Sequence, residues 1–406
     1  MIDPDTVTLG RVDDDGFPAF RRAFAATFGF DHSDEELERS RRVAEVDRLV
    51  AARDADGRIV GTSGAYTFGM SLPGGIDASC AGITVVSVRA DHRRRGLLTR
   101  MMEQLFADAD DRREPFAALW ASESPIYGRY GFGPAVPTLN VTIERQHGAL
   151  HHDGPVGEVE LLDPDAVTDT LPDLHEAARR QRGGTMTRPD GWWRRLVADP
   201  SDARDGAGPL RYALLPGRGF ATYRLKPDWG TGAPVGMVQL EDLVALDPGA
   251  TAALWRFVID TDLSAKLEAI RRPVDDPIVP LLIDPTRATF RYGWSLWLRL
   301  LDLPAAVAAR RYLVDGTIVL EVSDELRPAN AGRWRIEVTD GTARCERTDA
   351  APDLMMDTSG LATVLLGGVR ATQLHLASQV HGELAAAAAL DRLFAVDLAP
   401  NSDLMF

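Results

Sequence analysis

The stretch VVSVRADHRRRGLLTRMMEQL, from Val85 to Leu105, decides the fold of the first part of this 406-residue chain. Its β-branched start predicts a buried strand, and the apolar residues after Gly96 recur at helical spacing. Arg93, Arg94 and Arg95 therefore fall in a loop between a strand and the start of a helix. Backbone N–H groups at a helix N-terminus lack partners and carry the positive end of the helix dipole. The stretch thus predicts an anion site.

The amino-acid composition helps to decide what the arginine loop contacts. The loop could bind nucleic acid, face solvent or bind a phosphorylated small molecule. The chain has 60 acidic and 45 basic residues and a formal net charge of −15. Nucleic-acid binding depends on Lys and Arg neutralising phosphates, so it is disfavoured, and a cationic substrate is favoured. Neither GxxxxGK[ST] nor GxGxxG after a strand occurs. We interpret the arginine run as the rim of a site for a phosphorylated small molecule.

The cysteines and the apolar segments of the sequence indicate the cellular compartment of the protein. Cys80 and Cys345 lie far apart and outside any CxxC arrangement, so neither a disulfide framework nor a metal site is predicted. The N-terminus lacks the basic and apolar regions of a signal peptide, and no stretch approaches the roughly 18 apolar residues of a membrane span. We expect a cytoplasmic protein with no membrane partner, with non-standard export as the alternative.

The order of predicted elements divides the chain into three units. Residues 1–148 alternate short strands with amphipathic helices and close with the strand TLNVTIE, residues 138–144. In residues 149–297 the same order recurs, and the strand LWLRLLD, from Leu296, closes that unit. Residues 298–406 combine helices with short antiparallel strands. The predicted class is therefore α/β for the first two units and α+β for the last.

The second unit differs from the first at the decisive stretch. VQLEDLVALDPGATAALWRF, from Val238 to Phe257, occupies the corresponding place but has no arginine run and no RxxG. We therefore expect one phosphorylated ligand per chain, held by the first unit.

Two motifs carry a resemblance to a known family. The first is RRxGxL, formed by Arg93, Arg94, Gly96 and Leu98, which also reads as RxxGxL from Arg93. The second is IYGRYGFGPA, in which Tyr127, Gly131 and Phe132 form Y-x-x-x-G-F. Together with WASESP, they resemble the GCN5-related N-acetyltransferase (GNAT) superfamily and, within it, the enhanced intracellular survival (Eis) family.

The resemblance covers essentially the whole chain and implies a fold and an activity. It implies two tandem GNAT folds, the second degenerate, followed by a sterol carrier protein 2-like domain. It also implies a homohexamer that uses acetyl-CoA to acetylate amines of polyamine-like substrates, notably aminoglycosides. An acyltransferase acting on protein amines and a lipid carrier are the alternatives.

The same resemblance assigns roles to residues near the loop. Val86 and Val88 would present strand backbone to the pantetheine, and Ser122 would lie near the thioester. Arg95 is as compatible with solvent or a salt bridge as with the ligand. The phosphates would be held by Arg93, Arg94, Gly96, Leu97 and Leu98.

Two further residues would carry the chemistry. Tyr127 would be the general acid, because a tyrosine, with a pKa near 10, can protonate a departing thiolate whose own pKa is about 8.5. Tyr130 is a weaker candidate, and both could be core aromatics. The terminal carboxylate of Phe406 would be the base, although an apolar C-terminus is more often accidental. Its ordinary pKa of about 3.3 to 3.7 would require burial or a water relay.

The sequence departs from the family at the amine site. Trp120 stands where the family commonly has a histidine. No acidic residue occupies the family's register near the first helix, where Asp31, Asp34 and Glu35 are nearby substitutes. The resemblance therefore leaves the acceptor amine open.

Overall fold

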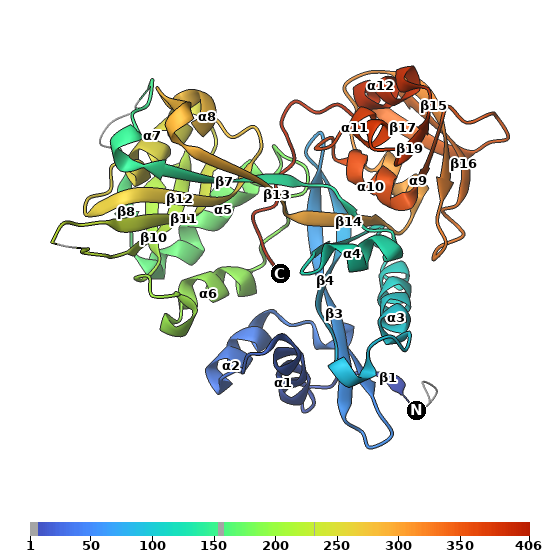
Figure 1. Cartoon of the computed structure of the whole chain (residues 1–406), viewed down its shortest axis with the longest axis horizontal. Coiled ribbons are helices and arrows are strands. Elements are labelled where there is room, and N and C mark those ends of the chain that lie inside the picture. The colour runs from blue at the N-terminus through green and yellow to red at the C-terminus, as the bar shows by residue number, and fades with distance from the viewer. Residues whose placement is uncertain (1–6, 153–157, 231) are drawn as a thin grey trace.

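The structure is a computed structural model that describes residues 7–152, 158–230 and 232–406. Within these residues the chain forms two seven-stranded sheets and one five-stranded sheet. Figure 1 shows the three sheets with their helices as three lobes around the C-terminal end of the chain.

The first sheet has the order β1-β2-β3-β4-β5-β14-β6 and is mixed, because β4 and β5 run parallel. Its strands are β1 (Thr8–Arg11), β2 (Val50–Arg53), β3 (Ile59–Leu72), β4 (Ile76–Val88), β5 (Phe116–Trp120), β6 (Gly133–Pro134) and β14 (Leu296–Leu300). Its helices are α1 (Phe17–Phe28), α2 (Asp34–Val43), α3 (Leu97–Asp111) and α4 (Ser124–Tyr127).

Helix α3 follows the decisive loop, as predicted, and covers the sheet with its apolar face. Leu97, Met101, Met102 and Leu105 recur at helical spacing and are buried against the strands. Burying such side chains stabilises the fold by roughly 1.5 to 3 kcal/mol each. The packing therefore holds the N-terminus of α3, and with it the arginine loop, at the C-terminal end of β4.

The second sheet has the order β13-β7-β12-β11-β10-β9-β8. Its strands are β7 (Pro137–Glu144), β8 (Glu160–Leu162), β9 (Arg211–Leu215), β10 (Gly219–Lys226), β11 (Gly236–Ala245), β12 (Ser264–Pro273) and β13 (Thr289–Trp294). Its helices are α5 (Val167–Arg179), α6 (Asp190–Ala198), α7 (Pro248–Ile259) and α8 (Ile278–Leu281).

The first two sheets exchange a strand, which corrects the sequence analysis. The strand over 138–144 was expected to close the first unit, but β7 pairs with β12 and β13 of the second sheet. The strand from Leu296 was expected to close the second unit, but β14 pairs with β5 and β6 of the first. Both segments are strands, as predicted, and only their partners differ.

The third unit has a five-stranded sheet in the order β17-β16-β15-β18-β19. Along β16, Trp334, Ile336 and Val338 are buried while their neighbours face solvent, the alternation typical of a half-covered sheet. Its strands and helices are α9 (Leu303–Ala308), β15 (Gly316–Ser323), β16 (Gly332–Thr339), β17 (Thr342–Arg347), β18 (Leu354–Asp357), α10 (Thr358–Leu365), α11 (Ala371–Leu376), β19 (Val380–Gly382) and α12 (Leu384–Leu393).

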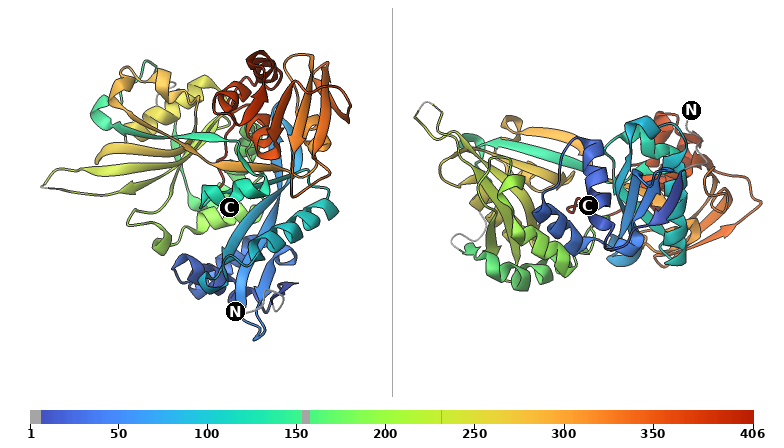
Figure 2. Two further views of the ribbon diagram at one scale, coloured as in Figure 1. Left: turned by 45° about the vertical axis from the view of Figure 1, so that its right-hand side comes forward. Right: turned by 90° about the horizontal axis from the view of Figure 1, so that it is seen from below.

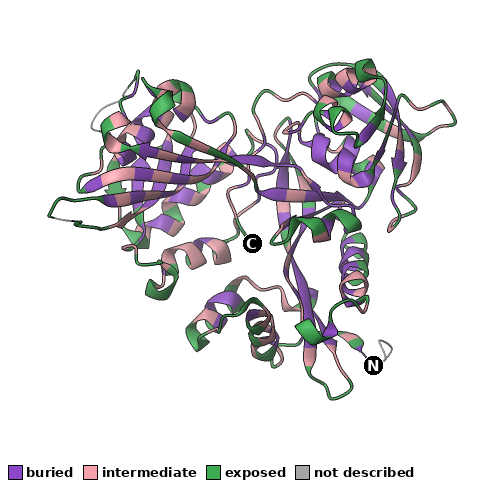
Figure 3. Ribbon diagram, in the orientation of Figure 1, coloured by how far each residue is buried: buried purple, intermediate pink, exposed green. Residues whose placement is uncertain are grey.

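The third unit shares a hydrophobic core with the first sheet. Leu296 and Leu298 of β14 belong to the same buried cluster as Leu320 of β15 and Leu361 of α10. Figure 3 shows the buried residues continuing from β14 into α10. The two units therefore form one packed body.

After α12 the chain runs back between the first two units as a C-terminal tail, residues 395–406. Arg182 donates to the Ala399 carbonyl over 2.7 Å, and the Asn401 amide donates to Gly183 over 2.9 Å. Figure 2 shows the end of the chain at the centre of the molecule in both views. Among the described residues, none of the helices has the length and apolar character needed to span a membrane.

Candidate active site

Strands β4 and β5 part in the middle of the first sheet. They pair only over Cys80–Gly82 and Phe116–Ala118. Beyond these residues β4 continues to Val88 and β5 to Trp120 without pairing to each other. Val85 has a positive φ of 48°, beside a register shift between β3 and β4. The bulge and the separation open a wedge-shaped space at the C-terminal ends of the two strands.

The arginine loop lies at one side of this wedge. Arg94 and Gly96 have φ values of 61° and 74°, and the N-terminus of α3 has no side-chain cap. A Cβ at Gly96 would meet no atom within 4 Å, so the backbone there is open to a ligand. Arg93 and Arg94 are exposed, whereas Arg95 turns back and donates to the Asp91 carbonyl over 2.7 Å. The uncapped helix amides and the two exposed guanidinium groups suit a pyrophosphate, although Arg93 Nε also donates to the Val88 carbonyl over 3.3 Å.

A cleft of about 560 Å³, called the loop cleft below, joins this loop to the wedge. The structure brings all eight predicted co-substrate residues together in its walls. They are Val86, Val88, Arg93, Arg94, Gly96, Leu97, Leu98 and Ser122. A cationic rim, open helix amides and an apolar strand edge fit the phosphates and the pantetheine of a coenzyme A thioester.

Tyr127 lies where the loop cleft meets a second cleft. Its side chain is 6 % exposed and hydrogen-bonds to Ser122. Burial raises the pKa of the Tyr127 hydroxyl above its ordinary value, so the group keeps its proton at neutral pH. Tyr130 is equally buried, but its hydroxyl lies 3.2 Å from Thr99 Oγ1. Tyr130 lines the loop cleft and not the aromatic cleft described next.

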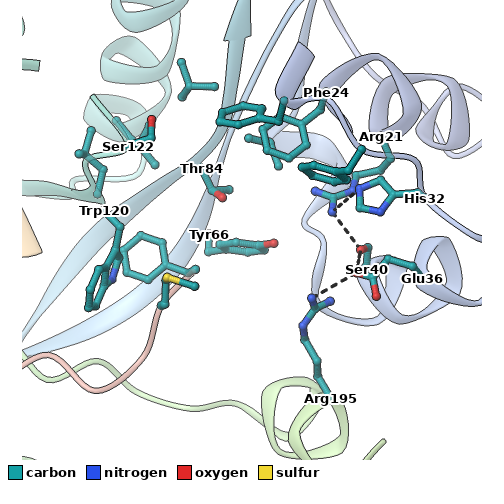
Figure 4. A pocket seen from close by; sticks show the side chains of 18 of the residues that line it. Arg21, Phe24, His32, Glu36, Ser40, Tyr66, Thr84, Trp120, Ser122 and Arg195 are labelled. Carbon is teal, nitrogen blue, oxygen red and sulfur yellow. Dashed lines mark hydrogen bonds and ion pairs between the residues drawn. The ribbon is translucent and has the colours of Figure 1, made fainter. Parts of the chain in front are cut away.

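The second cleft has a volume of about 770 Å³ and is called the aromatic cleft below. The first unit, helix α6 with the turn at Asp202 and Ala203, and the C-terminal tail form its walls, and Figure 4 shows part of the lining. It shares Phe28, Val86, Ser122 and Tyr127 with the loop cleft. Its aromatic residues are Phe24, Phe28, Phe30, Tyr66, Trp120, Tyr127, Trp192 and Phe406.

The tail brings Phe406 into the aromatic cleft. The Phe406 ring packs on Phe68, with 5.0 Å between the centroids. Trp120, which replaces the expected histidine, donates from Nε1 to the Leu404 carbonyl over 3.0 Å. Trp120 therefore holds the tail in place. The predicted catalytic residues Tyr127 and Phe406 thus border one space.

An ion-pair network fixes the tail three residues before its end. Asp403 Oδ2 lies 2.8 Å from Arg188 Nη2 and 2.9 Å from His175 Nε2. Arg188 also contacts Asp242 over 2.8 Å. Burial alone would raise the pKa of Asp403, but the charge of Arg188 and the hydrogen bond with His175 hold this pKa well below its usual range. Asp403 is therefore ionised at neutral pH.

The acidic residues that line the aromatic cleft differ from the three named in the sequence analysis. Asp31 lines the cleft, but Asp34 and Glu35 lie in the first turn of α2 and are absent from its walls. Glu36, which the sequence analysis did not single out, does line it, together with Arg21.

The other wall residues missed by the sequence analysis come from distant elements. Tyr66 lies on β3, and Trp192 and Arg195 lie on α6 of the second unit. Tyr66 and Trp192 make an edge-to-face contact with centroids 5.1 Å apart. No local motif marks these residues. Within the described ranges, no group of three or more His, Cys, Asp or Glu side chains is placed to hold a metal ion.

Comparison with protein families matches all three units. The acetyltransferase (GNAT) domain family matches residues 9–135, and a second acetyltransferase (GNAT) domain family matches residues 184–300. The sterol carrier protein domain family matches residues 303–401. The chain therefore contains two GNAT domains followed by a sterol carrier domain, as the resemblance implied.

Two relatives and a solved structure are similar to this chain over nearly its whole length. An uncharacterized N-acetyltransferase of Streptomyces coelicolor is 38 % identical over 397 residues, which cover 95 % of each chain. N-acetyltransferase Eis of Mycobacterium tuberculosis is 34 % identical, covering 92 % of this chain and 93 % of that protein. The crystal structure of Eis1 from Mycobacterium abscessus superposes with a TM-score of 0.86 at 30 % identity, covering 98 % of this chain and 100 % of that one.

Proposed function

Because this chain belongs to the Eis-like N-acetyltransferases of the GNAT superfamily, we propose that it acetylates a primary amine, with Tyr127 as general acid and the Phe406 carboxylate as general base. One observation carries the assignment of roles. Tyr127 borders both clefts, and Phe406 borders only the aromatic cleft. The loop cleft would hold acetyl-CoA, the co-substrate that the GNAT fold implies, and the aromatic cleft would hold the amine.

The residues of the loop cleft would bind and orient the thioester. Bound acetyl-CoA supplies the acetyl group and leaves as the free thiol. Arg93, Arg94 and the open amides at Gly96 would hold its phosphates, and the edge of β4 at Val86 and Val88 would bind its pantetheine. This arrangement would place the thioester between the ends of β4 and β5, beside Ser122 and Tyr127.

The proton balance assigns one step to each catalytic residue. A protonated amine must lose one proton to become a nucleophile and a second after its nitrogen bonds to the acetyl carbon. The Phe406 carboxylate would accept protons from the amine through water, because its ordinary pKa is too low for efficient direct transfer. As the carbon–sulfur bond breaks, the Tyr127 hydroxyl would donate its proton to the sulfur.

The experiment is a thiol-release assay with acetyl-CoA and a panel of amines. The panel contains aminoglycosides and polyamines, which the resemblance implies, together with arylalkylamines and a lysine peptide. We expect amine-dependent thiol release, with a mass increase of the amine that corresponds to one or more acetyl groups. Release that does not depend on any amine would contradict the proposal, and preference for the lysine peptide would favour an acyltransferase acting on proteins.

The assembly is proposed from the family resemblance alone, and the location from the sequence. We expect a homohexamer, which analytical ultracentrifugation of the full chain would test. The cytoplasmic location stays a prediction that cell fractionation would test.

A further inference from the structure

We infer that the acceptor has an aromatic body and an anionic group opposite its amine, and that Arg21 and Arg195 bind this anionic group. The inference rests on the proposed function and specifies its acceptor. It is carried by the charges and rings that line the aromatic cleft.

Arg21 is a partly buried cation without a counter-ion. Its Nη2 lies 3.2 Å from His32 Nε2 and 3.1 Å from Ser40 Oγ. Within the described part of the chain, it contacts no carboxylate at ion-pair distance, and its Nε is buried without a hydrogen-bond partner. Burial lowers the pKa of its guanidinium. A desolvated cation of this kind is stabilised by a ligand anion.

The nearest acidic side chain does not neutralise this wall. Arg195 Nη2 lies 3.2 Å from Glu36 Oε1, but Glu36 also accepts from Arg39 over 2.6 Å and from Ser40 over 3.1 Å. Burial would raise the pKa of Glu36, yet Arg39 and Arg195 lower it overall. Glu36 therefore pairs with two arginines, and among the residues that the structure describes Arg21 reaches it only through Ser40.

The remaining acids of the cleft lie toward solvent. Asp202 lies 3.8 Å from Arg39, with its side chain 62 % exposed. Asp31 is exposed as well. Exposed carboxylates are screened by water and contribute little to binding in the interior. The buried part of the wall is thus cationic.

Aromatic rings separate this wall from the reactive end. Figure 4 shows Tyr66 between Trp120 on one side and the group of Arg21, His32, Glu36 and Arg195 on the other. Tyr66 is half-buried and packs edge-to-face on Trp192. Such surfaces bind a flat apolar body well.

The two ends of the cleft therefore have opposite polarity. The Phe406 carboxylate would attract the ammonium group of the acceptor toward Tyr127, and Arg21 and Arg195 would attract an anion at the other end. A second ammonium group of a polyamine or aminoglycoside would meet these arginines. The cleft thus favours a zwitterion over the polycations that the family resemblance implies.

The test compares matched acceptors in the full chain. We expect a KM for 4-(2-aminoethyl)benzoate at least about tenfold lower than for 2-phenylethylamine, a difference of about 1.4 kcal/mol. Spermidine and kanamycin should have higher KM values than either. In Arg21→Gln the advantage of the carboxylated acceptor should disappear, and Arg21→Lys should restore part of it. Arg22→Gln is the control, since exposed Arg22 pairs with Asp34 outside the cleft.

The outcomes separate this inference from the proposed function. Equal KM values for the two arylalkylamines, or a lower KM for spermidine, would overturn the inference while acetylation itself stands. If no amine is acetylated, the proposed function is wrong. Calorimetry without acetyl-CoA then tests only whether Arg21 binds the anionic group. Binding of 4-(2-aminoethyl)benzoate that Arg21→Gln weakens at least about tenfold would support it. Absent or unchanged binding would overturn it.

Discussion

Two tyrosines three residues apart show how position determines chemistry at the scale of single residues. Tyr127 and Tyr130 are both 6 % exposed, so burial does not separate them. Tyr127 borders both clefts and hydrogen-bonds to Ser122, whereas Tyr130 contacts Thr99 and borders only the loop cleft. Of these two tyrosines, Tyr127 is the one whose position fits the proposed general acid.

Replacing the proposed acid should slow the chemical step. We expect Tyr127→Phe to lower kcat by about 10²- to 10⁴-fold, the usual contribution of a positioned general acid. The KM for acetyl-CoA should stay near the wild-type value, because Arg93, Arg94 and the amides at Gly96, and not Tyr127, would hold the phosphates. Tyr130→Phe is the matched control and should retain kcat within a few-fold. Steady-state kinetics of the two variants provide the test, and wild-type turnover in Tyr127→Phe would remove Tyr127 from its role.

The raised pKa of Tyr127 predicts the shape of the alkaline pH profile. Unfolded tyrosine ionises near pH 10, and burial moves the folded pKa of Tyr127 above that value. The acid form, and the stability linked to it, is therefore fully present below pH 10 and is lost as pH rises through the folded pKa. We therefore expect that deprotonation of the general acid does not lower kcat at pH values below about 10. A fall in kcat with a midpoint near pH 8 that Tyr127→Phe abolishes would contradict this assignment.

At the scale of elements, the C-terminal tail is a segment without regular secondary structure that side chains hold in place. Its anchors come from two other parts of the chain: Arg188 and His175 bind Asp403, and Trp120 binds the Leu404 carbonyl. Phe406 lies two residues beyond Leu404 and lines the aromatic cleft. The position of the proposed base thus depends on the second unit, which has no arginine loop of its own.

Neutralising the anchor should disturb the base. In Asp403→Asn, Arg188 keeps only Asp242 as an anionic partner among the described residues, so we expect a loss of about 1 to 3 kcal/mol in stability. We also expect kcat to fall at least about tenfold at a temperature where the variant stays folded, with the KM for acetyl-CoA unchanged. Kinetics and thermal denaturation provide both values. Asp397→Asn, at an exposed tail position, is the control, and unchanged kcat in Asp403→Asn would show that the anchor does not position Phe406.

At the scale of the whole molecule, features formed by adjacent residues were predictable and features formed by distant ones were not. The loop cleft is formed mainly by the contiguous stretch from Val86 to Thr99, so its residues could be predicted from one motif. The aromatic cleft combines Arg21, Tyr66 and Arg195 with the tail. These residues are far apart in the sequence, so no local sequence pattern predicts that they lie together.

Strand partners were unpredictable for the same reason. TLNVTIE and LWLRLLD both have the composition of strands, and they form β7 and β14. Their exchange between the first two sheets depends on pairings more than 120 residues apart, such as Thr142 with Glu268 and Leu298 with Ala118. Strand β12 was missed altogether, because its segment SAKLEAIRRP contains charged residues on the less buried face.

The exchanged strand β14 also joins the first sheet to the third unit through a buried ion pair. Arg299 on β14 is fully buried, donating from Nη2 to Asp324 Oδ1 and from Nη1 to Thr358 Oγ1, each over 2.8 Å. The Asp324 side chain is only 2 % exposed. The pair therefore lies in the core that the two units share.

Removing the cation from this core should destabilise both units together. In Arg299→Met the Asp324 carboxylate loses its buried counter-ion, which costs about 3 to 5 kcal/mol. Because the first sheet and the third unit share one hydrophobic cluster, we expect calorimetry to show their unfolding shifted as a single transition to lower temperature. Arg333→Met breaks an exposed pair with Glu321, whose side chains are 43 % and 41 % exposed, and should change stability by less than about 0.5 kcal/mol. Equal effects of the two substitutions, or a transition of the third unit that moves alone, would show that β14 does not couple the units.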